Sequence, residues 1–255
     1  MTAAGGGGGF AEPVVVDLPS PNHGPRAEGT RIDFLILHYT GMPSESGALA
    51  WLRDPRSEVS SHYFVHGDGA VVRLVPEERR AWHAGVARWR GLSDINSRSI
   101  GVEIANPGHD HGYRDFPDVQ IAAVIGLCRG IVVRHGIYPQ HVLAHSDVAP
   151  ARKADPGEKF PWDALHRAGV GHLVPPVPVR GGRFFQAGDA GPPVAALQQM
   201  LAIYGYDVDA SGVFDETTRA AVTAFQRHFR PDRVDGIADQ STIETLHALI
   251  SALPD

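Results

Sequence analysis

Three residues that lie far apart in the sequence have the types and settings of a catalytic zinc site. His38 follows the apolar run IDFLIL, His145 ends the run HVLAH, and Asp155 comes ten residues after His145. Both histidines are expected at strand ends, where a rigid element can present a side chain to a cleft. Two imidazoles and one carboxylate leave one tetrahedral position for water, as in catalytic rather than structural zinc sites. The set predicts one Zn²⁺ and a hydrolytic reaction.

Glu103 and Lys153 have the residue types that such a reaction needs in addition to the metal. A general base and an oxyanion stabiliser each lower the barrier by about 3 to 5 kcal/mol. Glu103 lies in the apolar run IGVEIAN, where a carboxylate is costly to bury without a function or a partner. Lys153 precedes Asp155 by two residues, which places both on one side of an extended segment. We therefore predict Glu103 as the base and Lys153 as the oxyanion stabiliser.

Spacing alone leaves this metal site a hypothesis, because the chain has 14 histidines and a strand-end histidine is more often structural than a ligand. His62 and His66 alternate along another predicted strand, and we do not predict a second metal site there. The chain has one cysteine, Cys128, in an apolar run. An intramolecular disulfide is therefore excluded, and we expect a buried structural thiol.

The elements that must position these residues alternate between strand and helix patterns. Strands are expected at 32–37, 62–66, 70–75, 99–105 and 141–145, and helices at 44–52 and 118–135. The second and third strands are separated by Gly67-Asp68-Gly69, which favours a hairpin. This alternation predicts an α/β fold with a mixed central sheet flanked by helices.

A proline-rich and glycine-rich stretch then precedes a small three-helix domain. Apolar residues recur at helical spacing in three runs after this stretch, and Asp215 and Asp239 are suited to cap the second and third helices. Pro192 and Pro193 fit a first helical turn. The predicted divisions are a disordered segment 1–16, a catalytic domain 17–173, a linker 174–190 and a three-helix domain 191–255.

Several motifs together resemble the zinc-dependent N-acetylmuramoyl-L-alanine amidases of the AmpD and AmiD type, which are related to peptidoglycan recognition proteins and phage amidases. The motifs are LHYT, SSHYFVHGDGAVVRLV, RRAWHAGVARWRG, INSRSIGVEIAN and AHSDVAPARKADPGEKFPW, in the expected order. By this resemblance His38, His145 and Asp155 match the zinc ligands, Glu103 the catalytic acid/base and Lys153 the transition-state lysine. The segment PSPNHGPR near the start is more similar to the AmiD branch than to the AmpD branch.

The resemblance also implies a substrate and a groove that binds it. Trp82, His83 and Asn96 lie in stretches similar to the family's substrate groove, although Trp82 could instead be core and Asn96 could cap a turn. The C-terminal segment resembles the three-helix peptidoglycan-binding domain of wall hydrolases. It has Asp215 and Ala238 where that module usually has glycine.

The resemblance implies hydrolysis of the amide between N-acetylmuramic acid and L-alanine in peptidoglycan or muropeptides. A non-catalytic peptidoglycan-recognition protein is one alternative, and a zinc hydrolase acting on another amide is a second. The wall-binding domain favours polymer or large fragments as substrate, whereas the missing signal pattern favours recycled 1,6-anhydro fragments. We expect polymer or large fragments.

Composition restricts the partners and leaves the compartment open. A net charge of -6 and a pI near 6.1 argue against nucleic-acid binding. No apolar run approaches the roughly 18 to 20 residues of a transmembrane helix, and the start MTAAGGGGGF lacks a signal pattern. We expect a monomer, cytoplasmic if this is the true start and periplasmic or envelope-associated if a signal has been removed.

Overall fold

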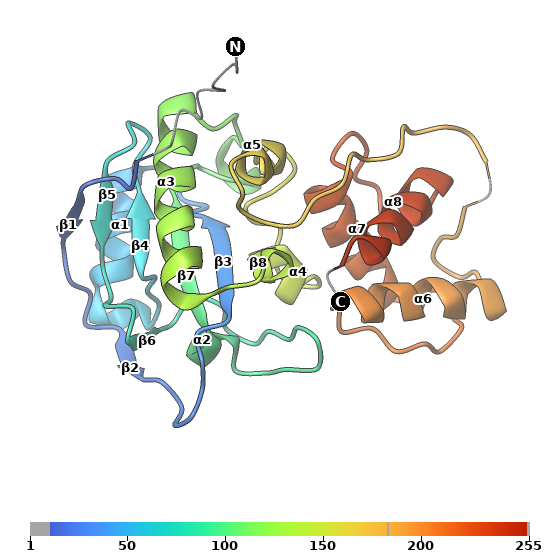
Figure 1. Cartoon of the computed structure of the whole chain (residues 1–255), viewed down its shortest axis with the longest axis horizontal. Helices are drawn as coiled ribbons and strands as arrows, with labels where there is room; N and C mark the ends of the chain where they lie inside the picture. The colour runs from blue at the N-terminus through green and yellow to red at the C-terminus, as the bar shows by residue number, and fades with distance from the viewer. Residues whose placement is uncertain (1–10, 183, 254–255) are drawn as a thin grey trace, which may run out of the picture.

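A six-stranded mixed sheet lies at the centre of the N-terminal part of the chain (Figure 1). The computed structural model describes residues 11–182 and 184–253. The sheet has the order β1-β5-β4-β7-β3-β8, with β1 (Val15–Asp17), β3 (Phe34–Tyr39), β4 (Tyr63–Val65), β5 (Val71–Arg73), β7 (Ser99–Ile104) and β8 (Val142–Ala144). Strands β4, β7, β3 and β8 are parallel, whereas β5 is antiparallel to β4. The predicted mixed sheet and hairpin are confirmed.

Helices cover both faces of this sheet. In Figure 1, α3 (Asp118–His135) crosses the near face and α1 (Glu45–Arg53) lies behind the strands. Helix α1 begins where the Ser44 side chain accepts a hydrogen bond from the Gly47 amide. The other short elements of this part are β2 (His23–Pro25), which pairs with β6 (Arg79–Ala81), the helices α2 (Ile95–Arg98), α4 (His145–Val148) and α5 (Trp162–Arg167), and the 3₁₀ turns Pro55–Ser57, His109–His111 and Pro139–His141.

Side-chain alternation along β7 separates an apolar face from a polar one. Ile100, Val102 and Ile104 join the core under α3, together with the fully buried Cys128. Burial raises the pKa of the Cys128 thiol to about 12, as expected for a structural cysteine. The intervening residues of β7 are Ser99, Gly101 and Glu103, and they face away from α3. The polar face of β7 is therefore available for a site.

The N-terminal prediction needs one correction. Residues 1–10 lie outside the described part of the chain, but Val15–Asp17 forms β1 at the sheet edge, paired in parallel with β5. The predicted disorder was therefore wrong for residues 15 and 16. The reason is local, because the run Val14-Val15-Val16 has high β propensity and finds an unpaired edge in β5.

Three helices form the C-terminal part, as predicted: α6 (Pro192–Tyr204), α7 (Glu216–Phe229) and α8 (Gln240–Ser251). Asp215 accepts a hydrogen bond from the Thr218 amide and Asp239 from the Thr242 amide, so both predicted N-caps are confirmed. No helix in the described ranges has the length and apolar content that a membrane crossing requires.

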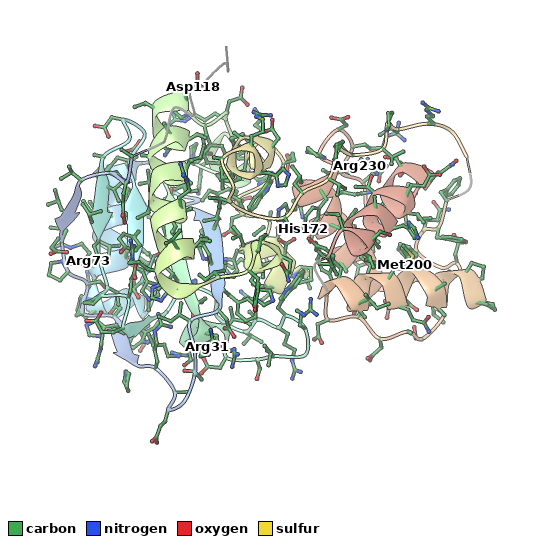
Figure 2. All side chains as sticks on the ribbon, viewed as in Figure 1. Arg31, Arg73, Asp118, His172, Met200 and Arg230 are labelled. Atoms are coloured by element: carbon green, nitrogen blue, oxygen red, sulfur yellow. The ribbon has the colours of Figure 1, made fainter. Side chains whose placement is uncertain are left out.

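The two parts share one hydrophobic core. Trp89, which is fully buried, extends from the loop after β6 and packs its ring 4.9 Å from that of Tyr206, centre to centre. The Trp162 ring of α5 stacks on His228 of α7 at 3.7 Å. His172, labelled in Figure 2, lies at this boundary and contacts the Tyr204 hydroxyl at 3.0 Å. The C-terminal domain is thus docked against the catalytic domain rather than only tethered to it.

Candidate metal centre and active site

His38, His145 and Asp155 converge at the carboxyl ends of the parallel strands. His38 lies near the end of β3, His145 is the first residue of α4 directly after β8, and Asp155 follows in an irregular segment. Nδ1 of His38, Nδ1 of His145 and Oδ2 of Asp155 lie 2.9 to 3.0 Å from one another, and all three side chains are buried. Ligands commonly bind beyond the carboxyl ends of strands in open α/β sheets. The structure brings the three predicted ligands together.

The donor atoms fit a zinc ion. Tetrahedral ligands bonded at 2.0 to 2.1 Å lie about 3.3 Å apart, close to the separations seen here. The Nε2 atom of His145 lies 3.1 Å from the Ala84 carbonyl oxygen, which can only accept, so the ring proton resides on Nε2. In neutral His145, Nδ1 is therefore a lone-pair donor that faces the Asp155 carboxylate. A metal cation can bridge these two atoms.

Burial and mutual contact set the charges of these groups. Burial lowers the pKa of His38 to about 4, so its imidazole is neutral at pH 7 and can bind a metal. Burial alone would raise the pKa of Asp155, but the adjacent imidazoles of His145 and His38 outweigh it and lower this pKa below its usual range. Asp155 is accordingly an anion.

Glu103 lies beside His38 on the polar face of the sheet. The two residues are register partners in the parallel β3–β7 pair, so their side chains project from the same face. The Oε2 atom of Glu103 is buried and has no hydrogen-bond partner among the described residues. Burial, and next the charge of Asp155, raise the pKa of Glu103 well above its usual range. Such a carboxyl group suits a general base and acid.

These residues open onto a cleft of about 480 Å³. Lys153 is half-buried in its wall, near enough to Glu103 and His38 to affect the pKa of both. Apolar side chains of α1 and its surroundings line another part of the cleft, namely Met42, Ala48, Trp51, Leu52, Val59 and Trp82. A mixed polar and apolar cleft of this size is typical of a small-molecule or polymer subsite.

The three residues predicted to bind substrate lie in different settings. Trp82 lines the cleft and is half-buried. His83 also borders the cleft but is only 8% exposed, and both of its ring nitrogens have protein partners. Asn96 is buried, and its Oδ1 accepts hydrogen bonds from the amides of His83 and Ala84. Substrate contact by these residues stays a prediction, as do the roles of Glu103 and Lys153.

The sequence patterns missed several residues that surround the site. Ser99 contacts His83, and Arg152 donates to the Ala84 carbonyl oxygen at 2.8 Å. Asp147 accepts hydrogen bonds from His228 and from the Tyr206 hydroxyl, both in the C-terminal domain. The signal that could have found Asp147 is its position two residues after His145, where a buried acid needs partners.

The fold and the site together define a mixed α/β protein with a candidate metal centre of the kind that supports hydrolysis. The chain belongs to the N-acetylmuramoyl-L-alanine amidase family, whose profile matches residues 28–158. A second profile, for a peptidoglycan binding domain, matches residues 190–246. The predicted resemblance is confirmed.

Named relatives agree with this assignment. The chain is 40% identical over 235 residues to the N-acetylmuramoyl-L-alanine amidase AmiD of Escherichia coli strain K12, covering 86% of this chain and 83% of AmiD. It is 31% identical over 163 residues to the 1,6-anhydro-N-acetylmuramyl-L-alanine amidase AmpD of the same organism, covering 57% of this chain and 86% of AmpD.

Solved structures show the same architecture. The complex of E. coli AmiD with anhydro-N-acetylmuramic acid-L-Ala-D-gamma-Glu-L-Lys superimposes with a TM-score of 0.74 at 36% identity, covering 89% of this chain and 92% of AmiD. AmpDh3 of Pseudomonas aeruginosa in complex with anhydromuramic pentapeptide gives a TM-score of 0.76 at 33% identity, covering 89% of this chain and 94% of AmpDh3. Both superpositions extend beyond the catalytic domain.

Proposed function

We propose that this protein hydrolyses the amide bond between N-acetylmuramic acid and L-alanine in peptidoglycan or muropeptides, with one zinc ion as cofactor. The convergence of two imidazole Nδ1 atoms and one carboxylate beside Glu103 carries this proposal. The solved complexes of AmiD and AmpDh3 with anhydromuramyl peptides support the substrate class.

His38, His145 and Asp155 would hold the zinc, which when bound polarises the amide carbonyl and lowers the pKa of water to roughly 7. Glu103 takes a proton from the attacking water on its carboxylate and then donates that proton to the nitrogen of the departing L-alanine. The ammonium group of Lys153 stabilises the negative charge that develops on the carbonyl oxygen. The apolar wall of the cleft, including Trp82, excludes water and orients the sugar or the stem peptide.

The docked C-terminal domain favours wall polymer or large fragments as the substrate. A second binding domain raises the local concentration of a polymeric substrate at the cleft when its geometry permits both contacts. Because this domain packs against α4 and α5, its position relative to the cleft is set by the shared core.

The test is to digest intact sacculi and soluble anhydromuropeptide in parallel, with and without a chelator, and to identify the products by mass spectrometry. The proposal expects free stem peptides that begin with L-alanine, and it expects the chelator to abolish their release. Products cut at a peptide bond would instead support a zinc hydrolase acting on another amide. No product from either substrate by the zinc-loaded protein would support a non-catalytic recognition protein.

A further inference from the structure

His83 and Ala84 are adjacent in the chain and contact the Nε2 atoms of His38 and His145. We call these the outer nitrogens, because they point away from the proposed metal position. The His83 Nδ1 atom lies 3.0 Å from Nε2 of His38, and the Ala84 carbonyl oxygen lies 3.1 Å from Nε2 of His145. The partner of the outer nitrogen determines which ring nitrogen of a metal-binding histidine is free. For His145 the partner is the Ala84 carbonyl oxygen, which can only accept, so the ring proton lies on Nε2 and Nδ1 is free.

The proton on His38 can be located by starting from Ser99. The Ser99 hydroxyl lies 2.7 Å from the Ile95 carbonyl oxygen, which can only accept, so the hydroxyl proton points there. The Ser99 oxygen is then an acceptor for Nε2 of His83 at 3.1 Å, and this nitrogen must carry the ring proton of His83. His83 is buried and its ring nitrogens contact Ser99 and His38, neither of which is an anion; because a buried charge without an ionic partner is costly, the ring carries a single proton and Nδ1 is bare.

The bare Nδ1 of His83 can only accept, so Nε2 of His38 must donate to it. A neutral His38 with its proton on Nε2 has a lone pair on Nδ1. That atom is the one that faces His145 and Asp155. The chain of hydrogen bonds that runs from His38 through His83 and Ser99 to the Ile95 carbonyl oxygen therefore leaves Nδ1 of His38 unprotonated and able to bind the metal.

Asn96 and Gly101 fix the positions of His83 and Ala84. The Asn96 side-chain oxygen accepts hydrogen bonds from the amides of His83 at 3.1 Å and Ala84 at 2.8 Å. Gly101 of β7 packs directly against the His83 ring. A Cβ atom on Gly101 would lie only 2.5 Å from ring carbon Cγ, so only glycine leaves room for the ring. Neither contact needs a bound substrate, which is consistent with a structural role toward the ligands.

We propose that His83 and Ala84, held in place by Ser99, Asn96 and Gly101, fix the tautomers of His38 and His145 so that both present Nδ1 to the zinc. This inference rests on the proposed function for the identity of the metal. It makes His83 and Asn96 positioning residues for the metal centre and not direct substrate contacts.

The first test measures zinc affinity of the full chain by competition with a chelator. His83→Leu removes the acceptor for His38 and is expected to weaken zinc binding by about 10- to 100-fold. His83→Asn places an amide oxygen near the position of Nδ1 and should recover most of that loss. Ser99→Ala should weaken binding about 10-fold, at the lower end of that range. Thermal unfolding of each metal-free variant verifies that it is folded.

The matched control is His62→Asn. His62 is also fully buried, its ring centre is 5.7 Å from that of His83, and its Nδ1 accepts from the Gly101 amide, which asparagine can imitate. Its zinc affinity should stay within about threefold of the unsubstituted protein. Equal weakening by His62→Asn and His83→Leu would overturn the inference, as would an unchanged affinity in folded His83→Leu.

The second test observes the tautomers directly. Long-range proton–nitrogen NMR spectra of the metal-free protein should show His38, His83 and His145 all protonated on Nε2. A proton on Nδ1 of His38 would overturn the inference. Because neither test involves substrate, a protein that passes both but cleaves no muropeptide would refute only the proposed function.

Discussion

The most specific stability prediction concerns a buried carboxylate that joins the two domains. Asp147 lies in α4, two residues after His145, and its side chain is inaccessible to solvent. It accepts hydrogen bonds from the Ala144 amide at 2.8 Å, from His228 Nδ1 at 2.7 Å and from the Tyr206 hydroxyl at 2.7 Å. Burial and the charge of Asp147 raise the pKa of Tyr206 well above its usual range, so this hydroxyl remains a donor.

Tyr206→Phe removes one of these donors and keeps the ring that packs on Trp89. A hydrogen bond to a charged group stabilises by about 1.5 to 3 kcal/mol. Asp147 retains two other donors, so we expect the lower part of that range, about 1.5 to 2 kcal/mol. For a chain of this size each kcal/mol shifts Tm by about 2 to 4 °C, which gives a decrease of roughly 3 to 8 °C.

The assay is urea and thermal unfolding of the full chain, with Tyr138→Phe as the control. Tyr138 is 62% exposed, so loss of its hydroxyl should change stability by less than about 0.5 kcal/mol. Both variants should unfold in a single transition, because one core includes residues of both domains. If Tyr206→Phe were as stable as Tyr138→Phe, the proposed interdomain contact would be refuted.

Four further predictions address catalysis, its pH dependence and stability. Glu103→Gln should keep its zinc and lose about 10²- to 10⁴-fold in kcat for stem-peptide release, and near-normal turnover would exclude Glu103 as the base. Because the pKa of Glu103 is raised, kcat/KM should fall as pH decreases through a value well above 4.5, and an acid limb at or below 4.5 would contradict this. Lys153→Met should lower kcat about 10²- to 10³-fold with little change in KM, whereas a change confined to KM would indicate substrate binding instead. Burial opposes ionisation of Glu77, but hydrogen bonds from Arg134, Tyr63 and His135 outweigh it and lower its pKa to about 2. The unsubstituted protein should therefore have a larger free energy of unfolding than Glu77→Gln, with the full difference present above pH 4.5 and lost as pH falls through 2. A difference in urea unfolding that does not change with pH would refute the lowered pKa of Glu77.

Local patterns were sufficient to predict most elements of the fold. Helix α3 begins at Asp118 and ends at His135, as its apolar periodicity indicated, and Asp215 and Asp239 cap their helices because an aspartate side chain can satisfy a free amide of the first turn. Strand β1 was missed because its stability depends on the edge of β5, which becomes adjacent only in the folded chain.

The metal centre was predictable as a set of residues but not as a geometry. Strand ends and an isolated acid indicated His38, His145 and Glu103, yet no pattern showed that β3 and β7 place His38 beside Glu103. The contacts of His83 and Asp147 were not predictable either, since they join segments distant in sequence. Hydrogen-bond partners across a fold depend on tertiary packing and not on local propensity.

The most direct test of the metal centre is a crystal structure of the zinc-loaded protein with anomalous data collected at the zinc edge. We expect one strong peak, bonded at about 2.0 to 2.2 Å to Nδ1 of His38, Nδ1 of His145 and an oxygen of Asp155, with Glu103 adjacent and not bonded. A peak located elsewhere, or coordination through Nε2 of either histidine, would contradict it.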